Sequence, residues 1–406
     1  MPFKTAIVFG LALVALGVTG SSAPGAPRLA ETSGHGFVGA VYFQTNSMPK
    51  NYIQVLFRRS NGTLKKGPHV YTGGSGTNQA SPFAKYGFKL LDSANSVVLS
   101  KDGRFLFAVN AGSDSVSSFR VKKKGLKLVN HLPTGGDLPV SVATAKKGKK
   151  TLVYVVNEWS GTIAGYTVSA TGKLHKLAGS MRSLFDPGKA SAAAMIGFNA
   201  NASTLTVSER GAIFDPVAMS FIGSGPDMID TFKVGANGLT SAPVGNHSVG
   251  EDPFGFGYTK KNVLFMTDSG VNGTVSTYSL NPATGTETPV DHKVAGGSAP
   301  CWVVFSKNQT HAWVTNSLTN SVSSFALGAN GSLTLQGVVT ATNNSALDEG
   351  SSRDGRYLYV ISTKVVGTVF TSTLVDIYRT AADGSLTHIG KTGVLPWPGA
   401  SGLAAS

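Results

Sequence analysis

Cysteine is nearly missing from this sequence, which has one, Cys301, among 406 residues. A single thiol excludes an internal disulfide and any metal centre built on several cysteines. Cys301 lies in an apolar run, so we expect a small buried side chain there, with a reactive thiol as the alternative. Charged residues are also scarce, at 14% of the chain, and 21 Asp and Glu against 35 Lys and Arg leave a formal net charge of +14.

Long hydrophobic runs are missing as well, with one short exception at the N-terminus. Lys4 precedes an apolar run of 13 residues from Ala6 to Val18, and small residues follow up to Ala23. This order is typical of a secretory signal peptide, and the run is too short for a membrane span, which takes about 20 residues. We predict a signal peptide over 1–22, a flexible leader over 23–36 and a secreted protein without a membrane span; an uncleaved anchor is the alternative.

The motifs of the common cofactor and metal enzymes are missing too. The chain has no P-loop, no glycine-rich dinucleotide motif after a strand, no HExxH, no GxSxG elbow and no cluster of Cys and His. No nucleic-acid reading module is recognisable. We therefore predict no metal, no cofactor and no nucleic-acid partner.

What the sequence does contain is a repeated β-pattern, in a chain with 50 glycines. The clearest copy runs from Lys101 to Val121: a turn, an apolar strand, a second turn and an alternating strand. Related phrases recur, and the anchor residues at the ends of their apolar strands are Asn46, Asn110, Asn157, Ser208, Asp268, Asn316 and Ser362. The anchors are spaced by 64, 47, 51, 60, 48 and 46 residues. β-patterned repeats of this size indicate a propeller with about one four-stranded blade per repeat.

Seven anchors predict an all-β fold, a seven-bladed β-propeller of four-stranded antiparallel blades over residues 37–406. The first unit, 39–73, has room for only three strands, while the last residues, 399–405, resemble one strand with nothing after it. We expect the C-terminal strand to complete the first blade and close the ring, which removes exposed sheet edges. We expect a monomer.

Charge is predicted to separate by face. In an antiparallel blade the first and third turns lie on one face, and the second turn and the connection to the next blade lie on the other. By this rule 19 of the 35 basic residues fall on the first face and 13 of the 21 acidic residues on the second. Solubility explains a basic face. The sharper hypothesis is that it binds acidic polysaccharide or cell-wall material.

Sequons for N-glycosylation agree with export. The chain has seven of them, at Asn61, Asn201, Asn246, Asn272, Asn308, Asn330 and Asn343. Asn-Gly-Thr and Asn-Gly-Ser are also good turn sequences. We therefore expect several of these sites, and not all, to carry a glycan.

Polar candidates gather around the predicted central funnel, where inner strands begin and second strands end. Histidine is not expected there, because six of the eight histidines fall in or beside predicted outer strands. The candidates are Asn95, Ser141, Glu158, Glu209, Arg210, Trp302 and Asp348. An acid beside an Arg of the next blade could bind a carboxylate or lactone and transfer a proton. An ordinary ion pair between blades is the alternative.

An apolar insertion follows these candidates in the fourth unit. Residues 211–227 read GAIFDPVAMSFIGSGPD and fall in the loop between the second and third strands. Apolar content on a loop indicates a lid over the funnel mouth, with packing between blades as the alternative.

Several phrases resemble the lactonase-like seven-bladed propellers, a family that includes 6-phosphogluconolactonase and 3-carboxy-cis,cis-muconate cyclase. They are DGRFLFAVNAGSDSVSSFRV, YVVNEWSGTIAGY, TVSERG, PFGF, CWVVFS and SRDGRYLYV, and the resemblance extends over essentially the whole chain after the signal peptide. It implies the propeller fold and an activity on a small organic acid or lactone.

The resemblance also implies a site of one His, one Glu and two Arg residues. The family His is replaced here by Asn95 and one Arg by Val140, whereas Glu158 and Arg210 match their phrases. The resemblance therefore implies Glu158 as the acid or base and Arg210 as the anion clamp, with Asn95 and Glu209 as supporting groups. Asn cannot shuttle a proton near neutral pH.

Two hypotheses follow. The chain is a secreted lactonase- or cyclase-like enzyme acting on a small organic acid or lactone, or it is a catalytically degenerate propeller that serves as a secreted or cell-surface binding protein. The matched Glu158 and Arg210 and the insertion favour the enzyme, and Asn95 and Val140 favour the binding protein.

Overall fold

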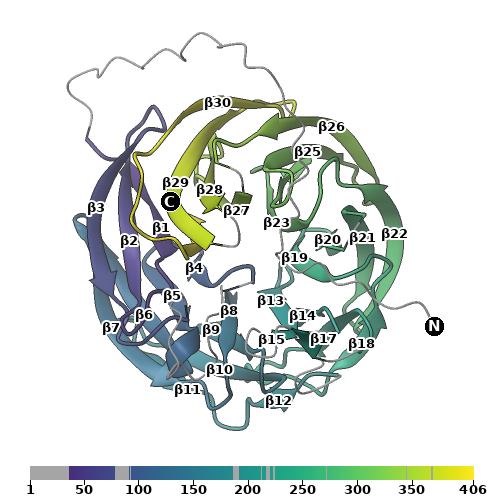
Figure 1. The fold of residues 1–406 in the computed structure, drawn as a ribbon. Coiled ribbons are helices and arrows are strands. Elements are labelled where there is room, and N and C mark those ends of the chain that lie inside the picture. The colour runs from purple at the N-terminus through teal and green to yellow at the C-terminus, as the bar shows by residue number, and fades with distance from the viewer. Residues whose placement is uncertain are drawn as a thin grey trace.

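The chain folds into a ring of β-sheets arranged radially around a central axis (Figure 1). The computed structural model describes residues 36–77, 91, 93–185, 192–211, 213–215, 220–222, 225–270, 272–343, 345–366 and 369–406. The predicted signal peptide and leader up to residue 35 lie outside these ranges. Within the described ranges, no helix has the length and apolar content needed to cross a bilayer.

Seven blades make up the ring, as predicted, each with four strands in antiparallel order. From the axis outward, blade 1 is β31 (Ser401–Ala405), β1 (Gly39–Gln44), β2 (Tyr52–Arg58) and β3 (Leu64–Tyr71). Blade 2 is β4 (Val97–Leu99), β5 (Phe105–Asn110), β6 (Ser115–Lys122) and β7 (Gly125–Pro133). Blade 3 is β8 (Pro139–Lys147), β9 (Lys150–Asn157), β10 (Thr162–Val168) and β11 (Leu174–Lys176), with β12 (Arg182–Ser183) also paired to β10.

The remaining blades follow the same order. Blade 4 is β13 (Ala193–Phe198), β14 (Thr204–Glu209), β17 (Met228–Lys233) and β18 (Val244–His247). Blade 5 is β19 (Pro253–Tyr258), β20 (Val263–Asp268), β21 (Thr274–Asn281) and β22 (Thr286–Val294). Blade 6 is β23 (Pro300–Phe305), β24 (His311–Asn316), β25 (Ser321–Leu327) and β26 (Leu333–Thr340). Blade 7 is β27 (Ser345–Ser351), β28 (Tyr357–Val366), β29 (Val369–Thr380) and β30 (Leu386–Lys391).

The burial of each strand reflects its distance from the axis. The second strands β5 and β20 are buried at every position, because a neighbouring blade covers each of their faces. The outermost strands β22 and β26 are exposed at most positions. Inner strands covered on both sides therefore need continuous apolar runs, and these runs made the repeat visible in the sequence.

The anchor residues tie the second strand of a blade to the third. The Asn110 amide donates to Ser115 Oγ at 3.1 Å and to Ser117 Oγ at 2.8 Å. In blade 6 the Asn316 amide repeats both bonds at the same distances, to Ser321 and Ser323. The repeated Asn followed by Ser or Thr is thus a structural requirement of the blade.

Two of the seven predicted anchors are not the residues that occupy the anchor position in the structure. Pro139 pairs with Asn157 across blade 3, and Ala193 pairs with Glu209 in the same way, so the anchor of blade 4 is Glu209 and not Ser208. In blade 1 the equivalent residue is Gln44, two residues before the predicted Asn46. A β-bulge in the innermost strand does not explain the two misses, because blades 3 and 6 have the same bulge beside anchors that were predicted correctly. The prediction followed residue type, and Asn46 and Ser208 resemble the other predicted anchors more than Gln44 and Glu209 do.

Glycines in the connections between blades allow the anchors to fit. A Cβ atom on Gly74 would lie 2.6 Å from the Asn110 side chain, and one on Gly297 would lie 2.6 Å from that of Asn316. Gly136 stands in the same relation to Asn157, at 2.5 Å. Any larger residue would separate the connecting loop from the blade that it leads into.

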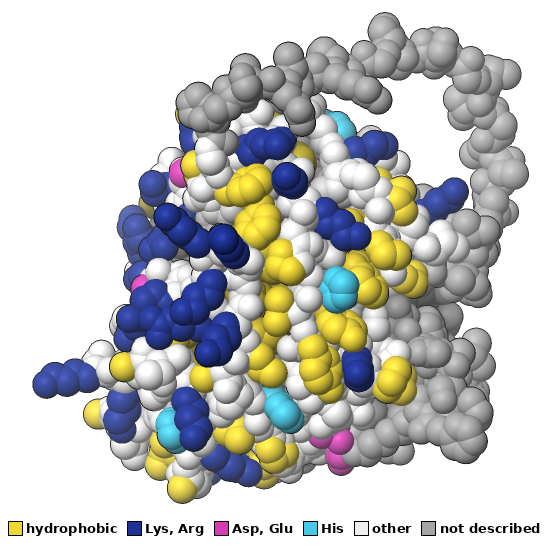
Figure 2. Space-filling view, turned by 90° about the vertical axis from the view of Figure 1, so that its left-hand side faces the viewer, with side chains coloured by type: hydrophobic (Ala, Val, Ile, Leu, Met, Phe, Trp, Pro, Cys, Tyr) yellow, Lys and Arg dark blue, Asp and Glu magenta, His cyan; other side chains and the backbone are white. Residues whose placement is uncertain are grey.

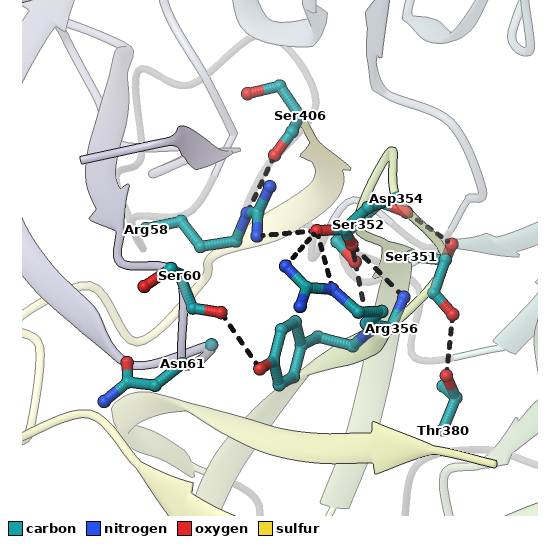
Figure 3. A network of polar contacts seen from close by, with 12 residues as sticks. Arg58, Ser60, Asn61, Ser351, Ser352, Asp354, Arg356, Thr380 and Ser406 are labelled. Carbon is teal, nitrogen blue, oxygen red and sulfur yellow. Dashed lines mark hydrogen bonds and ion pairs between the residues drawn. The ribbon is translucent and has the colours of Figure 1, made fainter. Parts of the chain in front are cut away.

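The ring closes where the predicted C-terminal strand, β31, pairs with β1. A polar network secures this closure (Figure 3). Arg58, 3% exposed, donates from Nε to the Ser406 carbonyl at 3.0 Å and contacts Asp354 Oδ2 through Nη1 at 3.3 Å. Burial opposes ionisation of Asp354, but hydrogen bonds from Ser352 and Arg356 and the charge of Arg58 outweigh it and lower the Asp354 pKa to about 2. One buried cation thus joins blade 1, blade 7 and the C-terminal strand.

The turns after the first and third strands share one face, as predicted. Figure 2 shows Lys and Arg side chains gathered along one edge of the side formed by the first blades. The opposite face is less acidic than predicted, because several acids counted there are buried between blades. They are Glu158, Glu209, Asp268, Asp348 and Glu349. Binding of acidic polysaccharide to the basic face stays a prediction.

Asp268, the anchor of blade 5, is a carboxyl where three other blades have Asn. It is fully buried, and its Oδ2 accepts from Ser276 Oγ at 2.7 Å and from Thr274 Oγ1 at 3.3 Å. Burial has the largest effect on the Asp268 pKa and, with the charge of Asp227, raises it to about 8, although the two hydroxyl hydrogen bonds act to lower it. Asp268 thus accepts from the hydroxyls of the third strand, whereas the Asn anchors donate to them.

The first prediction concerns ring closure. Replacing Arg58 with Met removes the buried cation and should lower the free energy of unfolding by about 2–4 kcal/mol. The exposed guanidinium of Arg356 pairs with the same Asp354, and replacing Arg356 with Met should leave that free energy nearly unchanged. Urea denaturation of both variants measures the difference. Equal losses would show that Asp354, and not closure through Arg58, is what matters.

The second prediction concerns pH. A carboxyl whose folded pKa lies above its unfolded value favours folding less as the pH rises, so Asp268 should lower stability progressively between about pH 4 and pH 8. Asp268→Asn should therefore raise the free energy of unfolding at pH 8.5 by about 1–3 kcal/mol and change it little at pH 4.5. Denaturation at both pH values tests this; a gain of the same size at each pH would refute the titration.

Candidate functional site

Glu158 and Arg210 converge, as the sequence predicted. Arg210 Nη2 lies 3.4 Å from Glu158 Oε1, and the ion pair joins blade 3 to blade 4. Each residue directly follows the second strand of its blade, after Asn157 in β9 and after Glu209 in β14. Equivalent positions of successive blades are neighbours in a propeller, which is why residues far apart in the sequence meet here.

The surroundings of Arg210 fix its orientation. Its Nε donates to the Ala192 carbonyl at 3.2 Å, and its guanidinium carbon lies 5.2 Å from the centre of the Phe254 ring in blade 5. The Arg210 side chain is 13% exposed, whereas that of Glu158 is wholly buried. The arrangement presents an edge of a stacked guanidinium, which suits a carboxylate or a polarised carbonyl oxygen, above an enclosed carboxylate.

Glu209 does not share that position. As the anchor of blade 4 its side chain is 1% exposed, whereas the next residue, Arg210, lies at the mouth. Successive residues in extended backbone point to opposite sides. The acidic Glu209 and the basic Arg210 therefore lie in different surroundings although they are adjacent in the sequence.

Three other predicted binding residues connect the innermost strands. Ser141 is buried, and its Oγ accepts from the Ile196 N–H at 3.1 Å. Asp348 is 3% exposed, and its Oδ2 accepts from the Gly402 N–H at 2.6 Å. Asn95 has left-handed backbone, with φ of 60°, and its carbonyl accepts from the Val142 N–H at 2.9 Å. Each connects one blade to the next.

Burial also decides the ionisation of the acids in β27. Burial raises the pKa of Asp348 to about 7, against the effect of the Gly402 N–H. Burial raises the pKa of Glu349 further above its usual range, and the neighbouring charge of Asp348 adds to this. These carboxyls are poor candidates for a permanently charged binding site near neutral pH.

Trp302 crosses the axis. Its indole N–H donates to the Ser93 carbonyl at 3.2 Å, which joins blade 6 to the segment before β4 in blade 2. Its ring packs edge-on against Phe254, with centroids 5.4 Å apart, and is 6% exposed. Near it, the Ala94 N–H, in the segment before β4 of blade 2, donates to the Ala194 carbonyl of blade 4 at 3.1 Å. At this level the described side chains fill the axis and bridge it.

Sequence reasoning missed the backbone partners of this region. The carbonyls of Ser93 and Ala192 hold Trp302 and Arg210, and a main-chain carbonyl leaves no signal in the sequence. The predicted outer position of six histidines is confirmed, since they lie in β3, β7, β11, β18, β22 and β30. Part of the insertion 211–227 forms a hairpin of β15 (Ile213–Asp215) and β16 (Ser220–Ile222). Whether it covers the mouth stays a prediction, because much of it lies outside the described residues.

Two surface hollows of the described chain lie away from the ion pair. One, of about 290 Å³, is lined by the first turns of blades 2 and 3, with Lys101, Phe105 and Lys146 among its residues. The other, of about 390 Å³, lies between blade 1 and the connection to β31, beside Tyr52 and Trp397. Among the described residues no group of three or more His, Cys, Asp or Glu side chains is placed to hold a metal ion.

Comparisons with known proteins agree with this fold. The family model described as "Lactonase, 7-bladed beta-propeller" matches residues 50–183, 143–301 and 258–398. A 6-phosphogluconolactonase of Formosa agariphila is 39% identical over 84 residues, which are 20% of this chain and 23% of that protein. The matched stretch thus spans less than a quarter of that relative's length.

Solved structures extend the likeness over the ring. A protein from Lactobacillus plantarum superposes with a TM-score of 0.65 at 15% identity, covering 91% of this chain and 99% of the other. The periplasmic gluconolactonase PpgL of Pseudomonas aeruginosa gives 0.63 at 16% identity, covering 90% and 98%. At such identities the structures support the fold alone, whereas the family model extends over most of the sequence. The chain belongs to the lactonase family of seven-bladed β-propellers.

Proposed function

We propose that this chain is a secreted enzyme that hydrolyses a small lactone, or closes one, at the Glu158–Arg210 pair. The observation that carries the proposal is the 3.4 Å contact between Arg210 and Glu158 beside Phe254, with the Arg210 side chain 13% exposed. Arg210 would bind the carboxylate or polarise the carbonyl oxygen of the ring ester. Glu158 would take a proton from water as it adds to the carbonyl carbon and return it to the ring oxygen as the C–O bond breaks.

The proposal sets a condition on the geometry. The Glu158 side chain has no exposed surface, so a substrate can reach it only when Arg210 shifts toward the incoming anion. Such a shift would break the Nε bond to the Ala192 carbonyl, while the contact with the Phe254 ring could be kept. Binding would then expose the base, which couples recognition to proton transfer.

A second candidate function is favoured by other observations. Asn95 stands where the family resemblance implies a His, and Trp302 bonded to Ser93 closes the axis beside the pair. A propeller without the proton-transferring His could bind the same carboxylates at Arg210 and release them unchanged. This second candidate is a secreted or cell-surface binding protein.

One experiment separates the two. Purified protein is assayed against a panel of aliphatic and sugar lactones, with product acid followed by titration at constant pH. Turnover should occur for at least one lactone, Glu158→Gln should lower kcat by about 100-fold or more, and Arg210→Met should mainly raise KM. Glu251→Gln, at an exposed acid before β19, is the matched control and should leave both constants unchanged.

The outcomes are distinct. Turnover that Glu158→Gln leaves intact would remove Glu158 from the mechanism. No turnover, together with thermal stabilisation of the wild type by the hydroxy acids that Arg210→Met abolishes, would establish the second candidate instead.

Export and glycosylation belong to the same proposal. Asn61, Asn201, Asn308 and Asn330 are exposed at turns of the basic face, and Asn272 is exposed as well. Asn343 is half-buried and donates to the Ser362 carbonyl at 2.8 Å.

Asn246 differs from every other sequon. It is 8% exposed, and its amide donates to the carbonyls of Ile229 and Gly285 at 3.1 Å each. A glycan there would break bonds between blades 4 and 5, so we expect this sequon to remain unmodified.

Expression in a eukaryotic host tests this. The secreted protein should begin near residue 23, and enzymatic release of glycans in heavy-oxygen water should label Asn61, Asn201, Asn308 and Asn330. The Asn246 peptide is the internal control and should stay unlabelled. Retention of the protein inside the cell, or a labelled Asn246 in folded protein, would contradict the proposal.

A further inference from the structure

A second site lies at the seam where the ring closes. The loop between β1 and β2 supplies Pro49 and Lys50, β2 supplies Tyr52, and the connection from β30 to β31 supplies Trp397 between two prolines. Together they line the hollow of about 390 Å³. It faces the same side as the funnel mouth but uses none of the residues around Arg210.

Two aromatic rings, Tyr52 and Trp397, line this hollow, and two more lie beside them. The rings of Tyr52 and Trp397 are nearly parallel, at 26° with centroids 6.4 Å apart, and His69 packs edge-on against both, at 5.1 Å and 5.6 Å. Tyr71 pairs with Tyr52 across β2 and β3 and is 39% exposed. A partly exposed cluster of four rings on a monomer surface is a common mark of a recognition site.

The platform is rigid. The Trp397 indole N–H donates to Gln54 Oε1 at 3.3 Å, and its carbonyl accepts from Thr373 Oγ1 at 2.7 Å. Pro396 and Pro398 restrict the backbone on either side of it. A ligand therefore meets a preformed surface and loses little affinity to ordering it.

The charge beside the platform is positive. Lys50 is exposed, and its ammonium lies 5.9 Å from the centre of the Tyr71 ring. No acidic side chain is among the described residues that line the hollow. An apolar face with one adjacent cation fits a flat ligand that carries an anion at its edge.

The chemistry distinguishes two classes of partner. A proline-rich peptide also docks on aromatic grooves, but its backbone carbonyls have no internal hydrogen bonds and need donors. The indole N–H of Trp397 is already bonded to Gln54, so the charged donor left at the hollow is the Lys50 ammonium, which favours an anionic ligand over a neutral peptide carbonyl. A sugar ring needs aromatic surface for its C–H side, which Tyr52 and Trp397 supply at the hollow, and polar groups at the rim for its hydroxyls.

We propose that this hollow binds an acidic sugar unit, a uronic acid of an oligosaccharide, with its ring on Trp397 and Tyr52 and its carboxylate at Lys50. The site is separate from the lactone site of the proposed function and is active in recognition only. It would hold the protein on acidic polysaccharide while leaving the funnel mouth accessible.

Titration calorimetry with trigalacturonate tests the proposal on the full-length secreted protein. Binding should be measurable in the micromolar to millimolar range, Trp397→Ala should weaken it by at least about tenfold, and Lys50→Gln by about tenfold. Trp397→Phe keeps an aromatic face and should retain most of the affinity, which guards against a simple folding defect. Lys101→Gln and Lys146→Gln on the basic face are the matched controls and should not change it.

Other outcomes overturn the proposal. Equal binding of neutral cellotriose that Lys50→Gln does not affect would exclude recognition of an acidic sugar. Competition by decaproline would assign the hollow to peptides. Binding lost only in the Lys101 and Lys146 variants would assign the saccharide to the basic face. No binding of trigalacturonate at about 10 mM would reject the site, because an affinity weaker than this is too low to be specific. Lactone turnover in Lys50→Gln is measured in parallel, so failure here and failure of the enzyme proposal are separable.

Discussion

Closure of the ring is the constraint on which the rest of this structure depends. A radial array of sheets buries both faces of every blade only if the last blade meets the first, and β31 paired to β1 makes that contact. Arg58 secures the closure because it bonds the C-terminal carbonyl of Ser406 and the Asp354 carboxylate while almost fully buried. Without the closure, blades 1 and 7 would expose apolar faces and unpaired strand edges to water.

Burial between blades explains why so many polar groups here are structural. Anchors at the ends of second strands, hydroxyls at the start of third strands and glycines in the connections form one repeated contact, seen at Asn110, Asn157 and Asn316. Burial raises the pKa of Asp268, an acid in an equivalent place, to about 8. A carboxyl between the blades of a propeller is therefore not by itself evidence of catalysis.

The two candidate sites differ in how the fold makes them. Arg210 and Glu158 sit on equivalent positions of adjacent blades, so the repeat itself brings them together, and the proposed chemistry uses the exposed edge of Arg210. The aromatic hollow lies at the seam, where the repeat is broken by the closing connection, and Trp397 belongs to no blade. Repetition thus brings the Glu158–Arg210 pair together, and the interruption of repetition creates the aromatic hollow.

The sequence by itself determined the fold class, the number of blades, the closing strand and the position of most histidines, because buried inner strands require apolar runs at a fixed repeat length. It also placed Glu158 and Arg210 at the ends of second strands in adjacent blades, where an acid and an Arg can meet. It placed the anchors of blades 1 and 4 wrongly, because residue type favoured Asn46 and Ser208 although the strands place Gln44 and Glu209 at the anchor position. Only the tertiary structure decided that Ser141 and Asp348 bond neighbouring strands, that Trp302 bridges the axis and that Asn246 is enclosed. Those outcomes depend on which way a side chain points between two curved sheets and on which main-chain group it meets, and neither is written in residue type or spacing.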